Sequence, residues 1–196
     1  LAGLLQLPKF SYATSVTFAN DADLLAIGCA APAGGVAIWK IGEAKEQSLL
    51  PTDSPVWTVA LVGQGDRLTA GELNGSLDVW SYPSCQLLGR TTLRADAPVY
   101  ALTPGEGAQV YAAIAYKDTG AERYEVTRWN VAASPKLEAN LANGPGATRG
   151  LTALPEERAL LSVGADGQAR KWNLDHQVLW HCPLSLEAST VACLAV

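Results

Sequence analysis

The sequence predicts an all-β protein built from a repeated unit of four short strands. Four tryptophans, Trp39, Trp80, Trp129 and Trp172, each close a similar segment and lie 41, 49 and 43 residues apart. A second series consists of the apolar residues Val16, Val59, Leu102, Leu151 and Leu194. Its spacings are similar to those of the tryptophans, and both series contain one longer interval of 49 residues, at the third unit. Two independent markers with one common interval indicate an internal repeat with a single insertion.

Each unit has the same internal order of strands and turns. We expect apolar first strands at 15–18, 56–61, 99–103 and 150–154, and second strands at 24–29, 67–72, 109–115 and 159–164. Each third strand carries the repeated Trp. The fourth strands, expected at 46–50, 85–90, 136–141 and 177–182, are more polar. No segment keeps a helical period over 11 or more residues, which disfavours alternating β/α folds.

Two turns carry strong hairpin signals. Asn74-Gly75 and Asp166-Gly167 separate the second and third strands of their units, and we expect both central residues of each turn to take positive φ. Four strands per roughly 43 residues are typical of one blade of a β-propeller. The polar fourth strands fit the outer edges of such blades, where charge discourages pairing with other chains.

At this level of pattern the chain resembles the WD-repeat family. Family members often join a Ser or Thr of the second strand, an Asp of the following turn and the Trp of the third strand by hydrogen bonds. Ser162, Asp166 and Trp172 match these positions in the fourth unit. Thr69, Asn74 and Trp80 match them in the second unit. The resemblance implies a structural role for these residues and for Trp39 and Trp129.

The chain also departs from the family pattern. The Gly-His dipeptide that precedes the first strand in the family is absent from every unit, so the network lacks its His. The residue after each Trp is never Asp. These residues are Lys40, Ser81, Asn130 and Asn173.

The repeats predict four full blades, at 13–50, 56–90, 99–141 and 148–182, within one partial propeller covering residues 1–196. Residues 1–7 align with the last strand of a preceding blade, and residues 189–196 align with the first strand of a following one. The chain begins at Leu1 and contains no Met. We therefore expect an open fragment of a larger propeller whose missing flanking chain supplies the remaining blades, about seven in most members of the family.

Composition narrows the function classes. Hydrophobic residues make up 48% of the chain, which excludes disorder throughout. The net charge is −5 without a basic run, so we expect no nucleic-acid partner. No apolar stretch is long enough to span a membrane as a helix, and we expect no membrane partner. The four cysteines are widely spaced and there are only two histidines, so no metal or other cofactor is expected. Without a targeting segment, a cytoplasmic location is favoured.

Positions at which the units differ indicate a binding surface. Thr14, Trp57, Tyr100, Arg149 and Ala192 stand two residues before the apolar marker of each first strand. Trp, Tyr and Arg are enriched at interface hot spots. We therefore expect Trp57, Tyr100 and Arg149 to line a rim that binds a partner, with packing between blades as the alternative.

The insertion in the third unit is the second candidate surface. Residues 115–124 extend the turn between the second and third strands and carry several charges. Tyr116, Arg123 and Tyr124 are its candidate contact residues, because insertions in repeat proteins often lie on the binding face. A loop without function is the alternative.

The sequence shows no catalytic constellation of nucleophile, base and orienting partner. We therefore expect a non-catalytic scaffold that mediates protein–protein interaction. The alternative is a ligand-sensing or enzymatic propeller whose active site or catalytic domain lies outside this chain, since a fold alone does not decide function.

Overall fold

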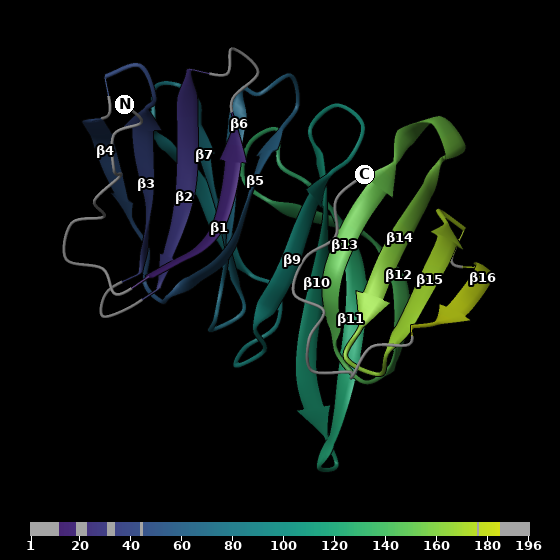
Figure 1. The fold of residues 1–196 in the computed structure, drawn as a ribbon. Coiled ribbons are helices and arrows are strands. Elements are labelled where there is room, and N and C mark those ends of the chain that lie inside the picture. Colours follow the sequence, from purple (N-terminus) through teal and green to yellow (C-terminus); the bar gives the residue numbers. More distant parts are fainter. Residues whose placement is uncertain (1–11, 19–22, 31–33, 44, 176, 185–196) are drawn as a thin grey trace.

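Four antiparallel sheets of four strands each are arranged as the blades of a four-bladed β-propeller (Figure 1). The computed structural model describes residues 12–18, 23–30, 34–43, 45–175 and 177–184. The predicted all-β propeller fold is confirmed for these residues. The strands expected at 1–7 and 189–196 lie outside them.

Each blade is an up-and-down meander in which the strands pair in chain order. The first blade contains β1 (Tyr12–Phe18), β2 (Leu24–Ala30), β3 (Gly35–Lys40) and β4 (Lys45–Pro51). The second contains β5 (Val56–Val62), β6 (Arg67–Glu72), β7 (Ser76–Ser81) and β8 (Leu87–Thr92). The third contains β9 (Val99–Pro104), β10 (Gln109–Asp118), β11 (Ala121–Asn130) and β12 (Lys136–Pro145). The fourth contains β13 (Thr148–Leu154), β14 (Ala159–Gly164), β15 (Gln168–Asn173) and β16 (Val178–Pro183). A single 3-10 turn, Pro155–Glu157, joins β13 to β14.

The first strands of the blades are the inner strands, and they contact one another in the order β1, β5, β9, β13. Side-chain hydroxyls join them. Ser15 Oγ accepts a hydrogen bond from the Val59 N–H at 3.2 Å, and Thr58 Oγ1 accepts one from the Leu102 N–H at 3.2 Å. Thr103 Oγ1 accepts one from a main-chain N–H of β13 at 3.1 Å. These bonds satisfy buried main-chain donors that belong to different sheets, so each blade is fixed to the next.

The hydrophobic core lies between neighbouring blades. Trp80 packs with residues of the first and second blades, Trp129 with residues of the second and third, and Trp172 with residues of the third and fourth. The four repeated tryptophans are only 3–7% exposed. Each Trp of blades two to four therefore fills the contact with the preceding blade, which explains why the residue recurs once per unit.

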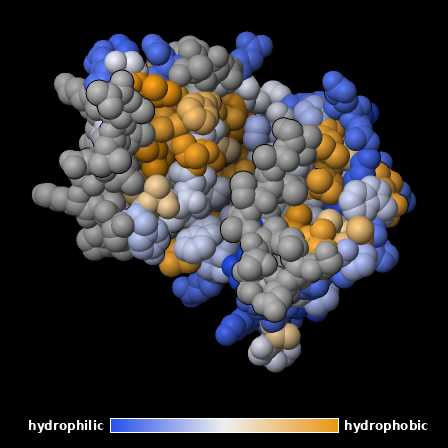
Figure 2. Space-filling view, viewed as in Figure 1, coloured by the Kyte–Doolittle hydropathy of each residue, from blue (hydrophilic) through white to orange (hydrophobic). Residues whose placement is uncertain are grey.

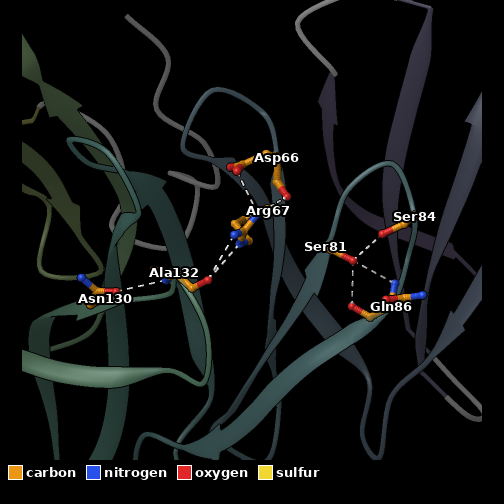
Figure 3. Close-up of polar contacts among 7 residues, drawn as sticks. All are labelled: Asp66, Arg67, Ser81, Ser84, Gln86, Asn130 and Ala132. Carbon is orange, nitrogen blue, oxygen red and sulfur yellow. Dashed lines mark hydrogen bonds and ion pairs between the residues drawn. The ribbon is translucent and has the colours of Figure 1, made fainter.

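Polar contacts also cross between blades, as Figure 3 shows for the second and third. Arg67 Nε and Nη2 both donate to the Ala132 carbonyl oxygen at 3.2 Å, and the same guanidinium pairs with Asp66 at 2.8 Å. Asn130 Oδ1 accepts the N–H of Ala132 at 3.0 Å and so holds the receiving segment in place. Within blade two, Ser81 Oγ bonds to Ser84 and Gln86 and closes the turn before β8 (Figure 3).

The expectation of two positive φ values at Asn74-Gly75 and Asp166-Gly167 is wrong. Only the glycines take positive φ, +88° at Gly75 and +71° at Gly167. The N–H of each glycine bonds to the carbonyl three residues earlier, as in a type I turn followed by a left-handed residue. The Asn74 and Asp166 side chains each accept the N–H two residues ahead, which stabilises this alternative turn.

The insertion of the third unit is a strand extension rather than a longer turn. β10 and β11 pair without interruption up to Asp118 and Ala121, and Thr119-Gly120 closes the hairpin with φ values of +48° and +85°. In the view of Figure 1 this hairpin projects beyond the other blades at the bottom of the molecule. The inner strand β9 begins near the same end, so the hairpin stands beside the entrance to the propeller axis.

Hydrophobic side chains are exposed over β1, where Figure 2 shows an orange patch. Val16 and Phe18 are 54% and 60% exposed there. The outer strand β16 is exposed along its whole length, Cys182 included, so this thiol is not buried. None of the helical segments among the described residues is long and apolar enough to cross a membrane.

Candidate functional site

A cavity of about 350 Å³ lies where the four inner strands meet. Its lining takes three consecutive residues from every inner strand. These are residues 14–16, 57–59, 100–102 and 149–151. Each of these triplets ends on the apolar residue that marks the first strand in the sequence. Trp57, Tyr100 and Arg149 therefore line the cavity from equivalent positions on three blades.

Trp57, Tyr100 and Arg149 form one continuous stack. The Trp57 and Tyr100 rings meet edge to face, with centroids 5.7 Å apart and an interplanar angle of 89°. The Arg149 guanidinium carbon lies 4.0 Å from the Tyr100 ring centroid, a cation–π geometry. Trp57 remains 36% exposed. The three residues thus contact one another across blades and still present surface to solvent.

The fourth equivalent position is occupied by Thr14 and plays a different part. Thr14 Oγ1 lies 2.8 Å from the carbonyl oxygen of Val56 in the next blade. The Thr14 hydroxyl therefore donates a hydrogen bond that joins blade one to blade two. Ala192, the fifth position of the series, lies outside the described residues.

A second hollow adjoins the cavity. It has a volume of about 430 Å³ and is lined by the connection that precedes β9 and by the β10–β11 hairpin, including Tyr100, Tyr116 and Lys117. The Arg94 guanidinium lies over the Tyr116 ring, 3.7 Å from its centroid, and Arg94 also pairs with Glu125 at 3.3 Å. Because Tyr100 lines both spaces, the central cavity and the hairpin form one continuous surface.

The three candidate contact residues of the insertion, Tyr116, Arg123 and Tyr124, have different surroundings in the structure. Tyr116 lines the hollow described above. Arg123 is half-buried, and its Nε has no hydrogen-bond partner among the described residues. Tyr124 is only 5% exposed and packs against Trp172, with ring centroids 6.3 Å apart. The expectation that Tyr124 offers contact surface is therefore wrong, because the ring belongs to the core between blades three and four.

The candidate structural network is only partly linked. Trp172 Nε1 donates to Ser162 Oγ at 2.8 Å. Asp166 instead accepts the N–H of Gln168 and pairs with Arg170, so it stabilises the turn and not the tryptophan. The Asp, Ser and Trp positions of the fourth blade are therefore not joined in one continuous network.

The other blades vary this arrangement. Thr69 donates to the Ala60 carbonyl at 2.9 Å, and Asn74 bonds within its own turn. Trp129 Nε1 donates at 2.8 Å to Thr127, two residues earlier on the same strand. Trp39 Nε1 is buried without a hydrogen-bond partner among the described residues. Packing against the preceding blade is thus the one role that the tryptophans of blades two to four share.

Sequence reasoning missed a cluster of charged residues within the second blade, two of which are buried. Glu72 and Asp78 are both 0% exposed. Arg90 Nε and Nη2 donate to the two Asp78 carboxylate oxygens at 2.6 Å, and Arg90 also pairs with Asp53 in the connection before β5. An Asp between Leu77 and Val79 in an apolar strand is the sequence signal that could have indicated it.

The charge state of Glu72 is unusual. Burial raises its pKa from 4.5 to about 7, the negative charge of Asp78 adds to the rise, and Arg90 offsets part of it. Neither Glu72 oxygen makes a hydrogen bond of good geometry to a described residue, although the main chain of Ser54 lies near enough to lower the pKa slightly. The cluster lies behind the start of β5, where Val56 pairs with Glu72, and so underlies the strand that carries Trp57.

Comparison with protein-family models and with curated proteins gives no match. The described residues also contain no group of three or more His, Cys, Asp or Glu side chains that could hold a metal ion. The side chains of the site supply two aromatic rings, a guanidinium and several hydroxyl groups around one cavity.

Proposed function

We propose that this chain is a WD-repeat-type scaffold that binds a protein partner at the mouth of its central cavity. The observation that supports the proposal is the stack of Trp57, Tyr100 and Arg149, which is exposed to solvent although three different blades contribute to it. Residues of these three types dominate binding energy when they cluster at the centre of an interface.

The surroundings of the stack suit a docking surface. Inner strands fixed by Ser15, Thr58 and Thr103 hold the stack on a rigid frame, so little ordering entropy remains to be lost on binding. The β10–β11 hairpin stands beside the cavity and adds Tyr116 and Lys117 to the same surface. A partner can therefore contact the cavity and the hairpin together.

The test compares partner capture with folding. Trp57→Ala, Tyr100→Ala and Arg149→Ala are combined in one variant, and thermal unfolding is measured beside affinity capture from cells that express the tagged chain. Leu87→Ala, at an exposed position on the outer strand β8, serves as the control. We expect the triple variant to lose its specific partners with a melting temperature within a few degrees of the unaltered protein, because these side chains are not buried.

Two results would overturn the proposal. Undiminished capture by the triple variant would show that the mouth does not bind the partner. A large drop in melting temperature would show that the three side chains act as packing between blades instead.

A further inference from the structure

Resting on the proposed function, we propose that the partner presents an acidic segment whose Asp or Glu side chain enters the central cavity and meets Arg149. The charge and the hydrogen-bonding groups of the cavity lining favour such an occupant.

Among the described residues that line the cavity, Arg149 is the one that carries a charge. Its guanidinium makes no hydrogen bond to another described residue, and its carboxylate contact, Glu122, lies at 3.9 Å, beyond hydrogen-bond distance. An arginine has five N–H donors in a fork that matches a carboxylate. A half-buried guanidinium with unused donors is therefore complementary to an anionic group from outside the chain.

The neighbouring hydroxyls strengthen this preference. Ser15 Oγ and Thr58 Oγ1 belong to residues that line the cavity, and each accepts a main-chain N–H while donating to no other described residue. Each hydroxyl therefore retains one proton to donate. The described part of the lining thus offers donors from Arg149, Ser15 and Thr58 and contains no carboxylate, since Glu122 belongs to the adjoining hollow. Such a lining favours an occupant rich in acceptor oxygens.

A basic occupant fits the same cavity poorly. The face of Tyr100 could attract a cation, but Arg149 already lies over it at 4.0 Å. A second cation would meet the Arg149 charge at close range in partly desolvated surroundings, where repulsion is strong. The exposed part of Trp57 suits instead an apolar side chain adjacent to the acidic one.

The chain's overall charge of −5 argues against a non-specific electrostatic effect. A long polyanion such as a nucleic acid would be repelled by the molecule as a whole. A short peptide segment can place a single carboxylate at Arg149 while exposing little other charge. We therefore assign the occupant as an acidic peptide segment of a protein.

The test titrates three peptides into the ¹⁵N-labelled chain and follows the amide signals of residues 57, 100 and 149 and the Trp57 indole signal. The probes are acetyl-Ser-Val-Glu-Val-Ser-amide and the same peptide with Gln or Lys in place of Glu. We expect the Glu peptide to shift these signals with an affinity about tenfold or more above that of the Gln peptide, as a charge-assisted hydrogen bond provides.

Variants of Arg149 test whether this residue is responsible for the tighter binding of the Glu peptide. Arg149→Gln should remove the advantage of the Glu peptide, and Arg149→Lys should keep part of it, because lysine retains the charge without the planar fork. Arg158→Gln makes the same chemical change at an exposed arginine beyond the opposite end of β13 and should alter nothing. Thermal unfolding of each variant checks the fold.

Three outcomes of the titration would overturn the assignment of an acidic occupant. Equal or tighter binding of the Lys or Gln peptide at these signals would overturn the acidic assignment and leave the docking site itself standing. Undiminished Glu-peptide binding by Arg149→Gln would also overturn it. Failure of all three peptides to shift the signals at millimolar concentration would overturn it too, whereas the docking proposal is judged separately by partner capture with the triple variant.

Discussion

Replacing Glu72 with Gln should stabilise the protein in alkaline solution and change little in acid. Glu72 is completely buried beside Asp78, and its pKa in the folded state is about 7 against an ordinary value of 4.5. The cause is burial first and the negative charge of Asp78 second, with Arg90 partly opposing both. Gln has nearly the same shape but cannot ionise.

The sign follows from proton linkage. Well below pH 4.5 the carboxyl is protonated in both states, so it does not alter the free energy of unfolding. As pH rises from there to about 7, the unfolded chain releases its proton while the folded chain retains it, and the folded state loses stability. A difference of two to three pKa units corresponds to about 3 kcal/mol above pH 7. The Gln variant avoids this loss.

Urea unfolding at pH 5 and pH 8.5 measures the effect. The free energy of unfolding of Glu72→Gln should exceed that of the unaltered protein by up to about 3 kcal/mol at pH 8.5 and by about 1 kcal/mol or less at pH 5. Glu122→Gln, a change at an exposed carboxylate on the hairpin, is the matched control and should show no such pH dependence. Equal or lower stability of Glu72→Gln at pH 8.5 would refute the reasoning, because it would mean that ionised Glu72 gains more from Arg90 than it loses by burial.

Three further predictions concern the frame that carries the site. Ser162→Ala should lower the free energy of unfolding by about 1–3 kcal/mol in denaturant titration, because the buried indole N–H of Trp172 loses its acceptor; an unchanged value would contradict the assigned bond. Thr58→Val should accelerate hydrogen exchange at the Leu102 amide, which loses its partner across the blades, and unaltered exchange would show that the hydroxyl is dispensable. Thr119→Asn should slow exchange in the β10–β11 hairpin, since Asn tolerates the φ of +48° better than a β-branched residue; faster exchange would count against that turn geometry.

The blades could be predicted from the sequence because the same core residue, a Trp, recurs once in each blade. A Trp that fills the contact with the preceding blade must recur at one position per unit, and its spacing therefore measures the blade. The same symmetry brought Trp57, Tyr100 and Arg149 together. Equivalent positions of successive inner strands surround one axis, so a comparison of those positions in the sequence already selects residues that line a common cavity.

Features that depend on contacts between distant segments were not predictable. The insertion contains charged residues and a Thr-Gly pair, which suggest a loop, yet uninterrupted pairing of β10 with β11 makes it a hairpin. The burial of Tyr124 depends on Trp172, nearly fifty residues further along the chain. Asp78 stands out within its apolar strand, but nothing in the sequence shows that the fold encloses it together with Glu72 and Arg90.

Photo-crosslinking at the mouth tests the central claim most directly. A benzophenone amino acid, which keeps an aromatic ring in place of that of Trp57, is introduced at position 57, or at position 87 on the outer strand β8 as the control, and the tagged chain is irradiated in cells. Both residues are exposed, so both substitutions should preserve the fold. We predict a discrete crosslinked protein from position 57 that is absent from position 87 and lost when Arg149→Gln is added. A crosslinked partner from position 87 with none from position 57 would contradict the assignment of the cavity mouth as the docking site.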